Sequence, residues 1–118
     1  MADSGLFIGF GYPVRGREQK AAQVFEEAIA LWTSWQQRGE IESVEPVLLE
    51  SHGGDLGGFF LLRGERDKIA SLRAGDELAR LVTRANLIVE NFGIVGAVLG
   101  ERIGTQMASF MEQAGELA

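Results

Sequence analysis

The sequence predicts an α+β fold in which helices cover one face of a four-stranded antiparallel sheet. Segments of alternating apolar pattern are interleaved with amphipathic segments of helical period, and a glycine-rich turn joins the second and third strands. The chain has 118 residues, which is the length of one domain (1–118) that buries roughly two-thirds of its unfolded surface.

The first strand is expected at Leu6–Val14, with a bulky face and a nearly bare face. Its bulky face carries Leu6, Ile8, Phe10 and Tyr12, and its nearly bare face carries Phe7, Gly9, Gly11 and Pro13. Glycine weakens a strand unless something packs close to its backbone. We therefore expect a helix, a neighbouring chain or a ligand on the bare face.

An amphipathic helix is expected at Glu18–Arg38. Its apolar stripe, at spacings of three and four, is formed by Ala21, Phe25, Ala28, Trp32 and Trp35. Gly39 is a suitable stop, because glycine accepts the left-handed turn that ends many helices.

A hairpin follows at Val44–Gly64, where VEPVLLESH and FFLLRG flank the turn GGDLGG. Both segments are apolar on both of their alternating faces, which indicates a sheet covered on both sides. Pro46 cannot donate a hydrogen bond to a neighbouring strand, so its strand is expected at a sheet edge, whereas Leu56–Arg63 suits the interior.

Residues Glu65–Val89 are expected to form two helices or one bent helix, broken at Ala74–Asp76 with Asp76 as the new N-cap. Asn91–Leu99 is a continuous apolar run typical of a buried strand. A closing helix then places on one side Ile103, Met107, Phe110, Met111 and Ala114.

These elements give the order βαββαβα. A right-handed crossover in the first βαβ unit, followed by insertion of the third strand, produces the ferredoxin-like sheet with strand order 4-1-3-2. That order places the Pro46 strand at an edge, as its chemistry requires.

A homodimer is expected because two long helices cover only one face of such a sheet, and the other face would expose an unusually large apolar patch. A second copy would bury about 800 Å² per chain, or about 20 kcal/mol of gross transfer free energy at about 25 cal/mol per Å². In the alternative, the C-terminal helix folds back over its own sheet.

The layout from Leu6 to Gly100 resembles the dimeric α+β barrel superfamily, which includes antibiotic-biosynthesis monooxygenases, EthD-like proteins and stress-responsive barrel domains. The resemblance rests on the order of elements, the broken second helix and the two-sided sheet. It implies two sheets packed back to back and a ligand cleft between each sheet and its own helices. The Asn, Trp and His of haem-degrading members do not carry over, since the first strand has no Asn and His52 lies on the hairpin.

Composition excludes several classes of partner. The net charge of −6 and pI near 4.8 disfavour nucleic acid and anionic membranes. The longest uncharged apolar stretch, Asn91–Gly100, is about half of the ~20 residues of a spanning helix. The absence of cysteine and of a secretory pattern at the start leads us to expect a soluble, cytoplasmic protein.

His52 and Tyr12 are the candidate catalytic residues. In an extended strand His52 shares a face with Glu50, and a carboxylate beside an imidazole is suited to moving a proton. The alternative is a solvated hairpin end. His52 is the only histidine, so we expect neither a zinc site nor any other metal or cofactor.

Two groups of residues are candidates for ligand binding. Trp32, Trp35 and Phe25 are suited to form an aromatic wall of a cleft, or else simply belong to the core. Arg15 and Arg17 precede the first long helix, where a carboxylate or phosphate would fit, unless the loop is merely solvated.

Asn91, near a strand end, is a further candidate contact in a pocket. Three functions remain open: a dimer that binds a small apolar or aromatic molecule, a cofactor-independent monooxygenase or isomerase acting on an aromatic substrate, and an assembly module that recruits a partner through an edge strand.

Overall fold

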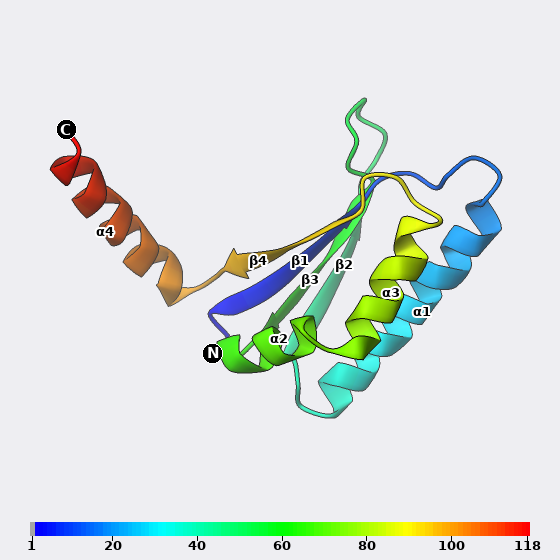
Figure 1. Ribbon diagram of the computed structural model, residues 1–118, viewed down its shortest axis with the longest axis horizontal. Coiled ribbons are helices and arrows are strands. Elements are labelled where there is room, and N and C mark those ends of the chain that lie inside the picture. Colours follow the sequence, from blue (N-terminus) through cyan, green and yellow to red (C-terminus); the bar gives the residue numbers. More distant parts are fainter. Residues whose placement is uncertain (1) are drawn as a thin grey trace.

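The computed structural model describes residues 2–118, so Met1, which the expected domain includes, lies outside the described residues (Figure 1). The elements are β1 (Ser4–Phe10), α1 (Glu18–Gln37), β2 (Ser43–Leu48), β3 (Gly58–Gly64), α2 (Arg66–Arg73), α3 (Asp76–Asn86), β4 (Gly93–Val98) and α4 (Glu101–Glu116). No helix in this part of the chain is long and apolar enough to cross a membrane.

The four strands form one antiparallel sheet in the order β2-β3-β1-β4, which is the expected 4-1-3-2 order. The chain therefore has the ferredoxin-like α+β fold. β2, which carries Pro46, is an edge strand as predicted. Helices α1, α2 and α3 lie on the same side of the sheet (Figure 1), and the opposite side is called the open face below.

The register assigns side chains to the two faces of the sheet. Leu6 pairs with Leu62 and Ile8 with Phe60, and all four are buried beneath the helices. The residues of the open face include Phe7, Val47, Phe59, Leu61 and Val95.

The open face also carries an ion pair, which corrects the expectation that both hairpin strands are apolar on both faces. Arg63 Nη1 on β3 lies 3.1 Å from Glu45 Oε1 on β2. The two residues project from the open face near the β2 edge, so one corner of this face is polar.

The amphipathic pattern explains α1. Its buried residues are Ala21, Val24, Ala28, Trp32 and Trp35, which are spaced three or four apart and so face the sheet. The helix ends at Gln37, one residue before the expected Arg38. Gly39 has the left-handed conformation (φ 73°) that was expected to end the helix.

The predicted break in the second helical region is confirmed, but its N-cap is not Asp76. Gly75 is the N-cap of α3, and Asp76 is the first helical residue. There its carboxylate lies in the first turn, where negative charge suits the helix dipole.

β1 and β4 are shorter than expected. β1 ends at Phe10, and beyond it Pro13 makes only an isolated bridge to Val89. β4 starts at Gly93 because Asn91 has a positive φ of 55°, which an extended strand does not accommodate.

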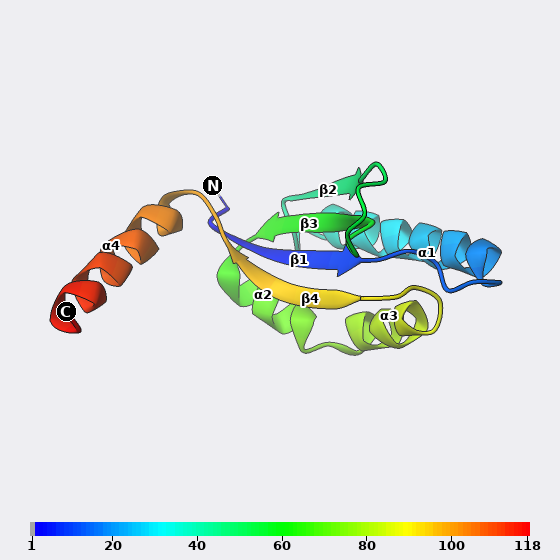
Figure 2. The ribbon, with the colours of Figure 1, turned by 90° about the horizontal axis from the view of Figure 1, so that it is seen from above.

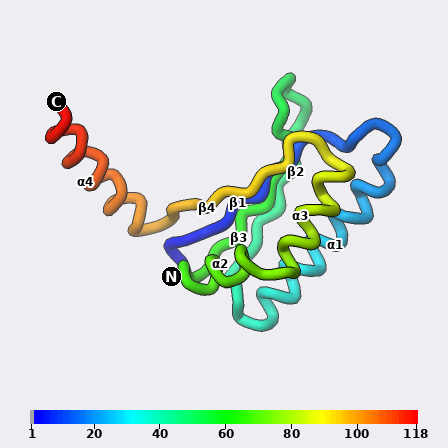
Figure 3. The backbone as a smooth tube through the Cα atoms, in the orientation of Figure 1, coloured from blue at the N-terminus to red at the C-terminus, as the bar shows by residue number. Residues whose placement is uncertain are grey.

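The hairpin loop is longer than the sequence suggested. β2 stops at Leu48, which pairs with Gly58, so residues 49–57 form an extended loop that projects beyond the sheet (Figure 3). Glu50 and His52 consequently lie in this loop and do not share a strand face.

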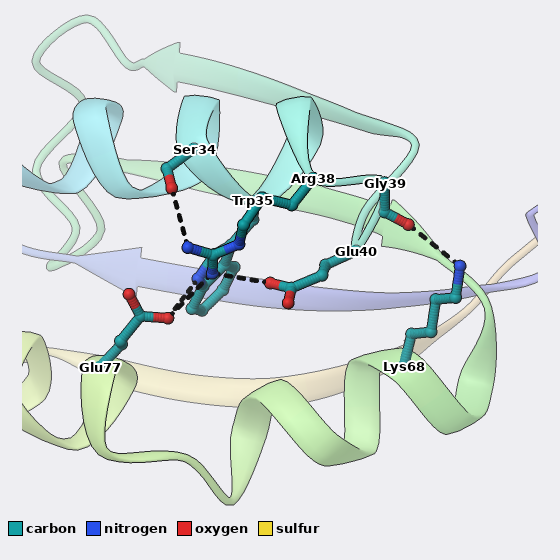
Figure 4. A network of polar contacts seen from close by, with 7 residues as sticks. All are labelled: Ser34, Trp35, Arg38, Gly39, Glu40, Lys68 and Glu77. Carbon is teal, nitrogen blue, oxygen red and sulfur yellow. Dashed lines mark hydrogen bonds and ion pairs between the residues drawn. The ribbon is translucent and has the colours of Figure 1, made fainter.

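Polar contacts hold α1 against α3 at the end of α1 (Figure 4). Trp35 Nε1 donates to Glu77 Oε1 at 3.0 Å, and Arg38 Nη2 donates to the same oxygen at 3.1 Å. These two donors, Trp35 first, lower the pKa of the Glu77 carboxyl below its ordinary value. Lys68 Nζ on α2 donates to the Gly39 carbonyl at 3.1 Å, so α2 is held to the same end of α1.

α4 forms as predicted but does not fold back over its own sheet. It extends away from the rest of the chain in two perpendicular views (Figures 1 and 2). None of its residues is buried. Its apolar stripe is therefore without a partner within the described chain.

Candidate functional site

A cavity of about 500 Å³ lies between the sheet and helices α1 and α3, at the end of the sheet where β1 stops. The sheet contributes Phe10 and Phe60, and α3 contributes Leu81 and Ala85. Phe10 and Phe60 are in contact, with ring centroids 5.6 Å apart. The inner surface is therefore almost wholly apolar.

The cavity exists because the buried stripe of α1 changes in size along the helix. Toward its N-terminal half the stripe is made of Ala21, Val24 and Ala28, which border the cavity. Toward its C-terminal half it is made of Trp32 and Trp35, which are 0% and 1% exposed and fill the space above the sheet. The small residues thus leave unfilled the volume that the tryptophans fill further along.

The mouth of the cavity is mixed in character. Tyr12, which is 42% exposed, and Leu48 and Leu49 line it from the sheet side. Glu18 and Glu26 on α1 line it as well and are exposed. Among the described residues no Lys, Arg or His lines the cavity, so its charged groups are carboxylates only.

Backbone hydrogen bonds fix the rim where three segments meet. The Gly11 N–H donates to the Glu90 carbonyl at 2.7 Å, and the Gly57 N–H donates to the Phe10 carbonyl at 2.8 Å. A Cβ on Gly11 would lie 2.5 Å from the Glu90 oxygen, so this close approach requires glycine. The rim is accordingly a preformed part of the fold.

An ion pair joins α1 to α3. Arg84 Nε and Nη2 donate to Glu27 Oε1 and Oε2 at 2.8 and 2.7 Å, a bidentate arrangement. The hydrogen bond from Arg84 is the main reason that the pKa of the Glu27 carboxyl lies below its ordinary value. Residues Ala28 and Ala85, next to this pair in sequence, line the cavity.

Of the residues singled out from the sequence, the structure places Tyr12 and Phe25 in the cavity lining. Phe25 also packs against Phe60, with ring centroids 5.1 Å apart. Trp32 and Trp35 lie deeper in the core, in contact with each other and outside the lining. The indole N–H of Trp32 has no hydrogen-bond partner within the described part of the chain.

His52 is held by its own loop and is not part of the cavity lining. Its Nε2 lies 2.7 Å from the Leu56 carbonyl oxygen, and its Nδ1 accepts the Gly54 N–H at 3.2 Å. Both ring nitrogens thus contact backbone atoms of the same loop, and neither contacts Glu50. Residues 2–118 hold no group of three or more side chains placed to bind a metal ion.

The remaining candidates are exposed and lie outside the cavity lining. Arg15 and Arg17 flank Gly16, whose N–H donates to Glu18 Oε2 at 3.2 Å. That contact occupies one carboxylate oxygen at the start of α1. Asn91 lies in the turn before β4 with its side chain exposed.

The alanine-lined wall was not predicted from the sequence. Ala21 and Ala28 belong to the predicted stripe of α1, but the predicted ligand contacts were the aromatic residues of that stripe. The sequence feature that indicates this wall is the decrease in side-chain volume along the stripe, from tryptophan at one end to alanine at the other.

No protein-family model matches the chain, and no curated protein sequence matches it. Solved structures with the same fold do match, all at low identity. A DABB family protein with a ferredoxin-like fold from Mesorhizobium loti is 16% identical, with a TM-score of 0.66, and the match covers 85% of this chain and 100% of that one.

A dimeric ferredoxin-like protein of unknown function from Thermobifida fusca is 10% identical, with a TM-score of 0.62 and coverage of 84% and 93%. SnoaB, a cofactor-independent oxygenase from Streptomyces nogalater, is 13% identical, with a TM-score of 0.54 and coverage of 85% and 96%. The chain is thus similar in fold to the dimeric ferredoxin-like, DABB and monooxygenase-like structures.

Proposed function

We propose that this protein is a homodimer that binds a small apolar or aromatic molecule in the cavity between its sheet and helices α1 and α3. The observation that carries the proposal is the cavity itself. Its volume of about 500 Å³ falls within the roughly 300–1,000 Å³ of typical ligand sites, and such sites are mostly apolar with few polar groups.

The charge at the mouth narrows the class of ligand. Glu18 and Glu26 are the charged side chains of the lining, and both are carboxylates. A negatively charged ligand would be repelled there, whereas a neutral aromatic molecule would not. The hydroxyl of Tyr12 at the rim is available to orient a polar substituent.

The dimer is supported by the open face of the sheet. Phe7, Phe59 and Leu61 project from this face, and the three helices α1, α2 and α3 cover the other one. A partly exposed apolar sheet face is typical of an interface between protein chains. Several proteins with the same fold are described as dimeric, which is consistent with the proposal.

Titration with N-phenyl-1-naphthylamine, a neutral fluorescent aromatic probe, tests ligand binding. We expect saturable binding of one probe per chain. Ala22 is exposed and lines the cavity, so Ala22→Trp should obstruct the mouth and weaken binding at least about 10-fold.

The matched control is Ala30→Trp, which adds the same side chain at an exposed position of α1 outside the cavity lining. It should bind the probe as the parent chain does. Absence of binding by the parent chain, or equal binding by Ala22→Trp and Ala30→Trp, contradicts the proposed site.

A cofactor-independent oxygenase acting on an aromatic substrate is the second candidate function. It is favoured by the position of Tyr12 at the cavity and by the fold shared with SnoaB. If Tyr12 moves a proton, Tyr12→Phe should slow dioxygen consumption with a dihydroxynaphthalene about 100-fold and leave probe binding unchanged. No consumption by the parent chain would remove this candidate.

A further inference from the structure

α4 is an amphipathic helix whose apolar side lacks a partner within the described chain. Ile103, Met107, Phe110 and Met111 are 50 to 64% exposed. They recur at intervals of three and four residues and so lie on one side of the helix, whereas Thr105 lies on the opposite side. A helix with this pattern is stabilised mainly by packing its apolar side against another surface.

The connection to β4 directs α4 away from its own sheet. Only Leu99 and Gly100 separate the strand from the helix, and Gly100 has a positive φ of 55°. The Leu99 N–H donates to the Asp3 carbonyl at 3.1 Å, and Arg102 Nη1 reaches the same oxygen at 3.5 Å. α4 therefore leaves the fold in a defined direction (Figures 1 and 2).

The open face of the sheet is the complementary surface. Phe7 and Phe59 are in contact there, with ring centroids 5.0 Å apart, and Val95 on β4 is 56% exposed. The Leu99 side chain packs over Gly5 at the end of this face, so the open face continues toward the start of α4. One chain thus presents both an apolar sheet face and an apolar helix that does not cover it.

We propose that two copies of this chain exchange their C-terminal helices, so that the α4 helix of each copy packs across the open sheet face of the other. This arrangement replaces the back-to-back packing of two sheets that the resemblance implied. The proposal rests on the homodimer of the proposed function and identifies the element that holds it together. It does not depend on what the cavity binds.

The dimensions of the two surfaces support the exchange. α4 has 16 residues and is about 24 Å long at about 1.5 Å per residue. The strands have six or seven residues and are about 20–23 Å long. One helix therefore spans the length of the sheet.

The area requirement points to the same arrangement. An aromatic side chain buries roughly 150–250 Å², so four large side chains that are at least half exposed, of which only Phe110 is aromatic, supply at most on the order of 400 Å². A stable interface needs about 800 Å² per partner. The helix alone supplies about half of this area, and the sheet face of the same chain must supply the rest.

Cysteine cross-linking tests the exchange cleanly because the chain has no native cysteine. We would combine an affinity-tagged chain carrying Phe110→Cys with an untagged chain carrying Val95→Cys, and treat the mixed dimer with a short bismaleimide. A cross-link between tagged and untagged chains is by construction intermolecular. We expect it with Phe110→Cys and not with Thr105→Cys, whose side chain lies on the opposite side of α4.

A single chain carrying both Phe110→Cys and Val95→Cys tests the alternative. An internal cross-link in a species with the mass of one chain would show that α4 folds back onto its own sheet, and would overturn the exchange. So would an intermolecular cross-link that forms equally well from Thr105→Cys.

Sedimentation of full-length variants separates the exchange from the dimer itself. Phe110→Glu should raise the dimer dissociation constant about 100-fold, and the matched control Thr105→Glu should leave it within about twofold. A parent chain that stays monomeric refutes both the dimer and the exchange. A dimer that Phe110→Glu leaves intact refutes the exchange alone, and probe binding by that variant reports separately on the cavity.

Discussion

Substitution of Phe60 by alanine is expected to remove the centre of the hydrophobic core. Phe60 lies on β3 beneath the helices and is 3% exposed. Its ring packs against Phe10, Phe25 and Trp32, with centroid separations of 5.6, 5.1 and 5.7 Å.

The expected cost follows from these contacts. Replacement of a buried Phe by Ala lowers the free energy of unfolding by about 3–5 kcal/mol. Phe60 also borders the cavity, so its removal enlarges a space that is already unfilled. We therefore expect a loss of about 4–5 kcal/mol, a large fraction of the roughly 5–15 kcal/mol by which such domains are stable.

Urea unfolding followed by tryptophan fluorescence measures this loss, since Trp32 contacts the substituted side chain. The parent protein and the Phe60→Ala variant should be compared at the same protein concentration, because the unfolding of a dimer depends on protein concentration. Leu87→Ala is the control: Leu87 is 64% exposed at the end of α3, and its loss should cost about 0.5 kcal/mol or less. A cost below about 1.5 kcal/mol for Phe60→Ala would refute the account of the core.

Two further predictions concern the rim and the helix contacts. Gly11→Ala should destabilise the fold by about 1–3 kcal/mol in the same urea assay, because its Cβ would lie 2.5 Å from the Glu90 carbonyl oxygen. Gly104 has open space around it, so the control Gly104→Ala should not destabilise the fold. Equal losses of unfolding free energy in the two variants would contradict the close approach at Gly11. The pKa values of Glu27 and Glu77 are lowered in the folded chain, so their contribution to stability is present above the unfolded value of about 4.3 and is lost as pH falls through the lower folded values. The double variant Glu27→Gln/Glu77→Gln should be less stable than the parent at neutral pH and should lose less stability on acidification, and parallel pH profiles would show that these contacts contribute nothing.

The sequence was sufficient for the order and pairing of the strands, because a few residues carried strong constraints. Pro46 assigned β2 to an edge, and the spacing of Ala21, Trp32 and Trp35 defined the buried side of α1. Gly39 took the left-handed conformation that marks the helix end. Each of these signals is local and depends little on the rest of the fold.

Element ends and the hairpin loop were less predictable, since they depend on pairing. The alternating pattern continues to His52, but β3 supplies partners only as far as Leu48. Asn91 directly precedes an apolar run and was counted with it, but its positive φ excludes it from the strand. Neither fact is visible in the pattern of side chains.

The cavity was only partly predictable for a similar reason. Tyr12 and Phe25 were recognised from residue type and position, whereas the contributions of Ala21 and Ala28 arise from what they leave unfilled. An empty volume depends on how far α1 and α3 stand above the sheet. That separation follows from Trp35, Glu77 and the other contacts between the helices, which lie far apart in the sequence.

Methyl NMR spectra recorded with and without N-phenyl-1-naphthylamine show whether the space between the sheet and the helices is a ligand site. We expect the probe to shift the methyl signals of Ala28 and Ala85, which line the cavity, and to leave that of Ala108 on α4 unchanged. Shifts that are confined to α4 or the open sheet face, with Ala28 and Ala85 unaffected, would contradict the proposed ligand site.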